Sequence, residues 1–217
     1  MKRKIIFDLI HGYIEIDTNM ESIINSESFQ RLKFINQLTV QHLYPSSNHT
    51  RFEHSLGVMY LSIKFFNCID SLLQKIIDGK PKDFFPTDII FLKNHLKYAA
   101  LLHDVGHSPL SHVGEHFYEK DKIIKNIEKN IIENALSINI EYLRTKGSSH
   151  EIMSCYVILH NYRKMFKEIF NDIDFEFIFR IIVGARYTKN NYPERNVIIS
   201  IVNSDSFDVD KLDYLIT

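Results

Sequence analysis

The residues best suited to metal chemistry are His103 and Asp104, which Gly106 and His107 follow closely. Neighbouring residues on a helix point about 100° apart. His103 and Asp104 can therefore converge on one ion only where a helix ends, and Gly106 is the expected stop. An imidazole and a carboxylate together suit Mn, Fe, Zn or Co, and open positions on such an ion suit hydrolysis. A bare His-Asp pair is more often a histidine that donates to a carboxylate at a helix end.

A second pair, Arg51 and His54, lies at the start of a predicted long helix. Three positions apart, the two side chains share one side of that helix. An arginine beside a histidine-rich metal site is what a phosphate substrate needs. The alternative is that His54 is a core or capping residue. Glu53 is expected to face away from His54.

A third group runs from His107 to Glu115 and contains His112, and His150 lies later in the chain at a predicted helix start. On a short helix His112 and Glu115 would share a face, and a carboxylate that orients an imidazole makes a good general acid or base. The alternatives are an ordinary solvated pair for His112 and Glu115, and a helix-capping role for His150.

The last group lies near the end of the sequence and contains Asp208, Asp210, Lys211 and Tyr214. An oxygen ligand from this segment would complete a His, His, Asp, Asp set around one ion. Lys211 and Tyr214 would be placed to touch an anionic, ring-bearing ligand. Read alone, the two aspartates would also pass as a solvated acidic face.

The elements that must position these groups are mostly helices. Ile14 and Ile16 alternate with polar neighbours, which predicts a short extended piece over residues 5–17, with a turn at Gly12. Apolar spacing predicts helices over 21–38, from Thr50, from Thr87 as N-cap to His103, from Ser149 or His150, over 175–185, and over 196–216 with a break near 205–206. Residues 106–116 are expected to be irregular or a short helix. We interpret residues 119–149 as a peripheral insertion, either solvated or acting as a lid or partner contact.

Composition limits the class of protein. The 217 residues are 45% apolar, with 7 Gly, 5 Pro and 2 Cys, which excludes a disordered, collagen-like or disulfide-stapled chain. The 26 basic and 27 acidic residues give a net charge of -1, so no global field attracts nucleic acid or an anionic membrane. No apolar run approaches the ~18 residues of a membrane span. Cys68 and Cys155 sit in apolar helical runs and are expected to be buried free thiols in a reducing cytosol.

The ordered set His54, His103-Asp104 and Asp210 resembles the signature of the HD superfamily of metal-dependent phosphohydrolases. Six short sequence motifs around these residues resemble its deoxynucleoside triphosphate triphosphohydrolase branch. The motifs are His11-Gly12-Tyr13-Ile14-Glu15, Phe29-Gln30-Arg31-Leu32, Gln37-Leu38, Arg51-Phe52-Glu53-His54-Ser55-Leu56-Gly57-Val58, His103 through His112, and Asp208-Val209-Asp210-Lys211.

The resemblance implies an all-α fold, an HD-domain helical bundle with a short N-terminal extended segment. It further implies a single HD domain over 1–217 that lacks the family's C-terminal part. One divalent transition metal would be held by His54, His103, Asp104 and Asp210, with Mg on the substrate phosphates as an option. The implied catalytic residues are His112, with Glu115 and His150 behind it, and the implied substrate contacts are Arg51, His107 and Lys211 on phosphates, Gln37 and Leu38 on the sugar, and Tyr214 on the sugar or base.

The implied reaction releases a deoxynucleoside and inorganic triphosphate. Two alternatives stay open: an HD phosphohydrolase acting on another nucleotide or phosphoester, and a non-catalytic nucleotide-binding or assembly module. The expected partners are a nucleotide substrate and, in a longer chain, further copies of the protein. No membrane is expected, and a nucleic-acid partner lacks support in the sequence. The expected location is the cytoplasm, or the nucleus in a eukaryote.

Overall fold

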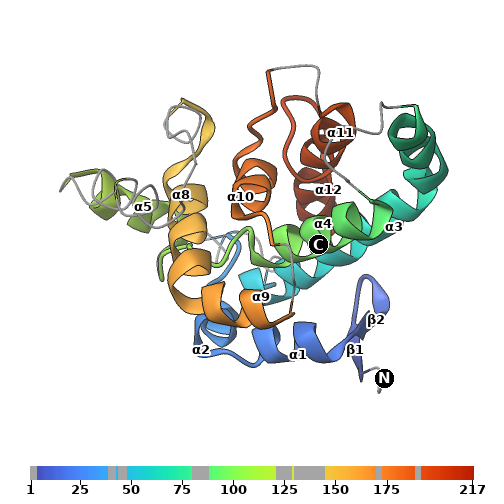
Figure 1. Cartoon of the computed structure of the whole chain (residues 1–217). Coiled ribbons are helices and arrows are strands. Elements are labelled where there is room, and N and C mark those ends of the chain that lie inside the picture. Colours follow the sequence, from blue (N-terminus) through green and yellow to red (C-terminus); the bar gives the residue numbers. More distant parts are fainter. Residues whose placement is uncertain are drawn as a thin grey trace.

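The computed structural model describes residues 4–38, 43, 48–79, 88–120, 129, 145–169, 173–188 and 192–217. Over these ranges the protein is a helical bundle with one small two-stranded sheet at its N-terminal end (Figure 1). The expected all-α class with a short extended segment is confirmed. The segment 119–149 falls mostly outside the described residues, so its role as an insertion stays a prediction.

The N-terminal segment forms a hairpin of β1 (Lys4–Asp8) and β2 (Gly12–Ile16), paired antiparallel. The predicted alternation is confirmed, because Ile14 and Ile16 are buried while Tyr13 is exposed. Gly12 adopts φ +74°, a left-handed conformation that glycine reaches at no steric cost.

The predicted helical stretch over 21–38 forms three short pieces, α1 (Thr18–Ile24), α2 (Glu27–Gln30) and a 3₁₀ turn η1 (Arg31–Phe34). Ser26 divides the stretch, since its hydroxyl accepts from Phe29 N as an N-cap.

Two long helices form the centre of the bundle, α3 (Arg51–Asp78) and α4 (Ile89–Leu102). A capping box between Thr50 and Glu53 starts α3, which is why Glu53 faces away from His54. The N-cap of α4 is Asp88, whose carboxylate accepts from Phe91 N, so the prediction of Thr87 as N-cap was one residue early. The helix ends just before His103, as Gly106 had indicated.

The remaining helices pack on this pair either directly or through one another (Figure 1). They are α5 (Ser111–Lys120), α8 (Ser149–Val157), a π-helical turn η3 (Ile158–Tyr162), α9 (Arg163–Ile169), α10 (Phe175–Val183), α11 (Pro193–Val202) and α12 (Val209–Ile216). The predicted break in the last helix is confirmed, and it separates α11 from α12.

Helix α3 is apolar enough to be compared with a membrane span. In the described part of the chain its length and its mean hydropathy of 1.3 over 18 residues would allow it to cross a membrane, a property that the core helices of soluble proteins share. In this fold α3 packs against α4, α11 and α12. Cys155 is buried as expected, but Cys68 is exposed, because it faces outward from α3. The prediction of burial was therefore wrong for Cys68.

His95 lies inside the core on α4. Its Nδ1 donates to Phe91 O at 2.8 Å, and its Nε2 accepts from Asp174 N at 3.0 Å. Burial lowers the pKa of His95 to about 4, and the nearby Arg195 charge acts in the same direction. The Phe91 carbonyl and the Asp174 charge oppose the shift. This histidine is a neutral structural residue at pH 7.

Candidate active site

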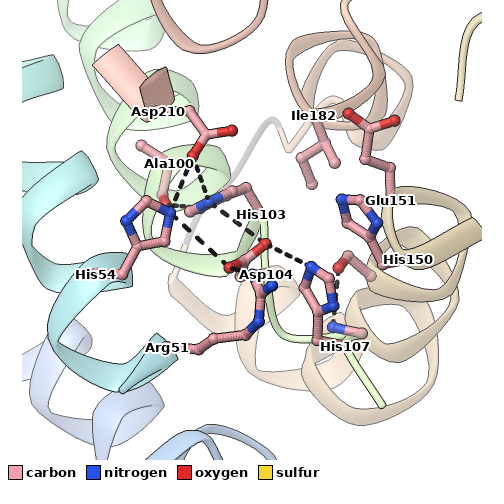
Figure 2. Close-up of polar contacts among 12 residues, drawn as sticks. Arg51, His54, Ala100, His103, Asp104, His107, His150, Glu151, Ile182 and Asp210 are labelled. Atoms are coloured by element: carbon pink, nitrogen blue, oxygen red, sulfur yellow. Dashed lines mark hydrogen bonds and ion pairs between the residues drawn. The ribbon is translucent and has the colours of Figure 1, made fainter. Parts of the chain in front are cut away.

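Three predicted ligands from three helical regions meet at one point (Figure 2). His54 comes from the second turn of α3, His103 from the end of α4, and Asp210 from the start of α12. Asp210 Oδ1 lies 2.9 Å from His54 Nε2 and 3.6 Å from His103 Nε2. Residues 156 positions apart are thus brought together by the packing of α12 on α3.

Both histidines are oriented from behind by their other ring nitrogen. His54 Nδ1 donates to Asp213 Oδ2 at 2.7 Å, and His103 Nδ1 donates to Ala100 O at 2.8 Å. Each Nε2 is thereby turned toward Asp210. Among the described residues, His103 Nε2 is buried and has no hydrogen-bond partner. A buried nitrogen left in this way is free to act as a metal ligand.

Asp104, the fourth predicted ligand, adjoins this group. Its Oδ1 lies 3.5 Å from His103 Nε2, and its Oδ2 lies 3.9 Å from His54 Nε2. The same Oδ2 accepts a hydrogen bond from Arg51 Nη1. Asp104 therefore faces the other ligands while one of its oxygens is held by a guanidinium.

The donor set fits a divalent transition ion. Ligand atoms at about 2.0–2.1 Å from such an ion are about 2.8–3.4 Å apart at octahedral or tetrahedral angles. The observed separations of 2.9, 3.5 and 3.6 Å are close to that requirement, whereas the 3.9 Å between His54 Nε2 and Asp104 Oδ2 is longer, since this oxygen is held by Arg51. Two imidazoles with carboxylates form a mixed N/O set that suits Mn, Fe, Zn or Co. His54, His103, Asp104 and Asp210 are the residues that would hold the ion.

The charges at this point favour a cation. Burial disfavours protonation of His54, but hydrogen bonds with Asp210 and Asp213 and the charge of Asp104 outweigh it and raise its pKa to about 10. Burial likewise opposes ionisation of Asp104, yet the Arg51, His103 and His107 charges hold its pKa well below its ordinary value. The negative potential that attracts a proton here would attract a metal ion as well.

A second cluster lies beside the first and joins His107, His112, Glu115 and His150. Glu115 Oε1 accepts from His112 Nδ1 at 2.6 Å and from His150 Nδ1 at 3.0 Å. His107 stacks on His150 with ring centroids 4.0 Å apart. Its Nε2 lies 3.3 Å from Asp104 Oδ1, so the two clusters are continuous (Figure 2).

The environment divides the titrating groups of this second cluster. Burial disfavours the charged form of Glu115, but hydrogen bonds from His112 and His150 hold its pKa well below the ordinary value. Burial also disfavours charge on His150, and Glu115 overcomes it and raises the His150 pKa. Burial, helped by the His150 and Arg51 charges, lowers the pKa of His107 to about 4 in spite of the opposing effect of Asp104. Groups whose pKa values are pushed apart are typical of acid–base sites.

Arg51 connects the two clusters. Besides Asp104, its guanidinium donates to Ser111 Oγ through Nε at 3.1 Å and Nη2 at 2.5 Å, and Nη2 lies 3.5 Å from His112 Nε2. Ser111 holds a φ of 50°, a strained conformation for a residue with a side chain. An anion that met His112 would therefore also meet the guanidinium.

The other predicted substrate contacts are less closely grouped. Gln37 is nearly buried, and its Oε1 has no hydrogen-bond partner within the described ranges, while Leu38 beside it is half-buried. The Lys211 ammonium donates to Ser204 O at 2.6 Å and to Asp208 Oδ2 at 3.0 Å, so it is not directed at the ligand group. Tyr214 is 44% exposed. The roles of Lys211 and Tyr214 stay predictions.

The sequence reasoning assigned no role to Asp213 or His11, which contact the site. Asp213 is fully buried and also accepts from His11 Nε2 at 2.6 Å. The available signal was the spacing of Asp210 and Asp213, which places both carboxylates on one face of α12.

Fold and site together define a helical domain with a candidate metal site, and the comparisons identify its family. The HD domain family matches residues 51–213, so the chain belongs to the HD domain family.

Among curated proteins, the chain is similar to a deoxynucleoside triphosphate triphosphohydrolase SAMHD1 homolog of Dictyostelium discoideum, at 30% identity over 98% of this chain and 35% of that protein. The human deoxynucleoside triphosphate triphosphohydrolase SAMHD1 is 38% identical over 51% of this chain and 16% of its own length. The chain thus spans about a third or less of the length of these relatives. A crystal structure of a hypothetical protein from Aquifex aeolicus matches with a TM-score of 0.62 and 26% identity, covering 99% of this chain and 45% of that one.

Proposed function

We propose that this HD domain hydrolyses deoxynucleoside triphosphates to a deoxynucleoside and inorganic triphosphate. The observation that carries the proposal is the continuity of the two clusters, in which Asp104 lies 3.5 Å from His103 and 3.3 Å from His107. A metal site beside an acid–base pair can act on the phosphorus of a phosphoester bond while the pair protonates its leaving oxygen. The names of the two curated relatives support the substrate class.

Each cluster has a distinct task in this reaction. A bound divalent ion would lower the pKa of a water molecule and offset phosphate charge. Arg51 binds the phosphates from the side of Ser111. His112, held by Glu115, donates the proton that the leaving 5′-oxygen requires, and His150 fixes the position of Glu115 from the opposite side. His112 suits this task because its ring is exposed to incoming substrate.

Gln37 supports the assignment of a sugar-binding position. Its nearly buried Oε1, which has no partner in the part of the chain that the structure describes, is an acceptor for a ligand hydroxyl. Leu38 next to it would supply the crowding that disfavours a 2′-hydroxyl. A deoxyribose would meet both requirements, because its free 3′-hydroxyl can donate to Gln37 and it has no 2′-hydroxyl to clash with Leu38.

The proposal is tested by incubating the chain with Mn²⁺ and each deoxynucleoside triphosphate in turn. Inorganic triphosphate and a deoxynucleoside in equal amounts are the expected products. Release of monophosphate from other phosphoesters without triphosphate would indicate a different HD phosphohydrolase. Metal binding without turnover, in this chain and in a longer one, would indicate a nucleotide-binding or assembly module.

Two substitutions separate the clusters. His103→Ala should abolish metal binding, because it removes a ligand nitrogen that faces Asp210. His112→Ala should keep the metal and lower turnover by about 10²–10⁴-fold, the range for removal of a general acid. Near-native turnover in His112→Ala would refute the acid–base assignment.

We propose further that residues 1–217 form a single HD domain, that a longer chain containing it assembles with further copies of itself, and that the protein acts in the cytoplasm, or in the nucleus in a eukaryote. The sedimentation coefficient of such a longer chain, compared with that of residues 1–217, tests the assembly.

A further inference from the structure

The carboxylate of Asp213 links two histidines from opposite ends of the sequence. Asp213 Oδ2 accepts from His54 Nδ1 at 2.7 Å, and Asp213 Oδ1 accepts from His11 Nε2 at 2.6 Å. All three side chains are at most 5% exposed. Each oxygen of the buried carboxylate therefore has one dedicated imidazole partner.

His11 is held in place by the hairpin turn. Asp8 Oδ1 accepts from Ile10 N at 2.9 Å and from His11 N at 2.8 Å, and Gly12 supplies the positive φ that the turn requires. A two-stranded hairpin by itself is marginally stable. This one is anchored by the buried Ile14 and Ile16 side chains and by the bond from His11 to Asp213, 202 residues away.

Gly57 in α3 gives independent evidence that this carboxylate has a required position. A Cβ at residue 57 would lie 2.0 Å from Asp213 Oδ1 and 2.6 Å from His11 Nε2. Glycine in a helix interior is less stable than alanine by about 1 kcal/mol. At that cost in helix stability, Gly57 leaves the space beside its backbone that Asp213 and His11 occupy.

We propose that His11 and Asp213 are positioning residues of the metal centre. The path runs from His11 through Asp213 to His54, and it fixes the tautomer and direction of His54 so that Nε2 faces Asp210. The N-terminal hairpin is thus a working part of the metal site. The inference rests on the metal site of the proposed function and is independent of its substrate.

The test measures metal affinity in the absence of nucleotide. The whole chain is stripped with a chelator and titrated with Zn²⁺ against a competing chelator. Absorption of the Co²⁺-loaded protein reports the geometry at the ion. Asp213→Asn should weaken Zn²⁺ binding by about 10–100-fold, the usual effect of losing such a partner. His11→Phe should weaken it by about tenfold, whereas His11→Gln, whose amide can still donate, should recover most of the loss.

Matched controls separate positioning from general damage. His95→Gln alters a histidine that, like His54, is buried and hydrogen-bonded at both ring nitrogens. His95 lies about 12 Å along α4 from His103. It should leave the Zn²⁺ affinity unchanged. Gly57→Ala should lower the affinity, although alanine favours the helix. Gly79→Ala should leave the affinity unchanged, because its Cβ would meet nothing closer than Lys75 O at 3.4 Å.

Each outcome decides the matter. Zn²⁺ affinity within twofold of the original in both Asp213→Asn and His11→Phe, with loss in His54→Gln, would overturn the inference and leave the metal site intact. Unchanged affinity in His54→Gln would overturn the metal site together with the inference. If Asp213→Asn fails to fold by circular dichroism, His11→Phe, which keeps the buried carboxylate, decides alone.

Discussion

The contact between Arg51 and Asp104 gives the sharpest test of the electrostatics. Both side chains are almost fully buried, at 3% and 4% exposure. Asp104→Ala would remove the carboxylate and leave the guanidinium buried beside His103 and His107. Removing one partner of a buried ion pair destabilises a protein by about 3–5 kcal/mol.

The structure favours the lower end of that range. The two bonds from Arg51 to Ser111 Oγ, at 3.1 and 2.5 Å, survive the substitution and keep the guanidinium partly satisfied. We therefore expect a loss of about 3 kcal/mol in the free energy of unfolding. For a chain of this size that corresponds to a melting temperature lower by about 6–12 °C.

The assay is urea denaturation at pH 7 with excess chelator, so that loss of a bound ion does not contribute. Arg51→Met in the Asp104→Ala background should restore most of the stability, because no buried charge is then left unpaired. A loss below about 1 kcal/mol in Asp104→Ala, or a double variant as unstable as the two single losses added together, would contradict this account.

Two further predictions concern the core. His95 has a folded-state pKa of about 4 against 6.5 in the unfolded chain, so the unfolded state takes up the proton first as pH falls. Its contribution, about 3 kcal/mol at most, is present above pH 6.5 and is lost between pH 6.5 and 4. His95→Gln should flatten that part of the stability–pH curve measured by urea titration, and an unchanged slope would contradict the assignment. Gly106→Ala should destabilise the fold by at least about 2 kcal/mol, because its Cβ would lie 2.2 Å from Ser154 N in the backbone of α8. A melting temperature equal to that of Gly79→Ala would show that α8 can move away.

The sequence by itself determined the elements and the list of candidate ligands. Helical spacing predicted α3, α4, α8, α10 and the broken terminal helix, because an apolar stripe must face a core whatever its partner is. Ordered words around His54, His103-Asp104 and Asp210 were specific enough to indicate the family, which the match over residues 51–213 confirmed. The apolar pattern could not decide whether Thr87 or Asp88 is the N-cap of α4, because both are polar residues that directly precede the helix. It also could not separate the exposed Cys68 from the buried Cys155, because both lie in apolar helical runs.

Only the tertiary structure decided which groups meet. The packing of α12 on α3 brings Asp210 and Asp213 to opposite nitrogens of His54, and no local rule connects residues 156 or 159 positions apart. The same packing turns Lys211 toward Ser204 and Asp208, although its neighbour in sequence, Asp210, is a candidate ligand. Successive side chains within a helix point about 100° apart, so Asp210 and Lys211 face different directions, whereas packing between separate helices brings residues distant in sequence together. His11 enters the site for this reason, through contacts that exist only once the hairpin has docked beside α3.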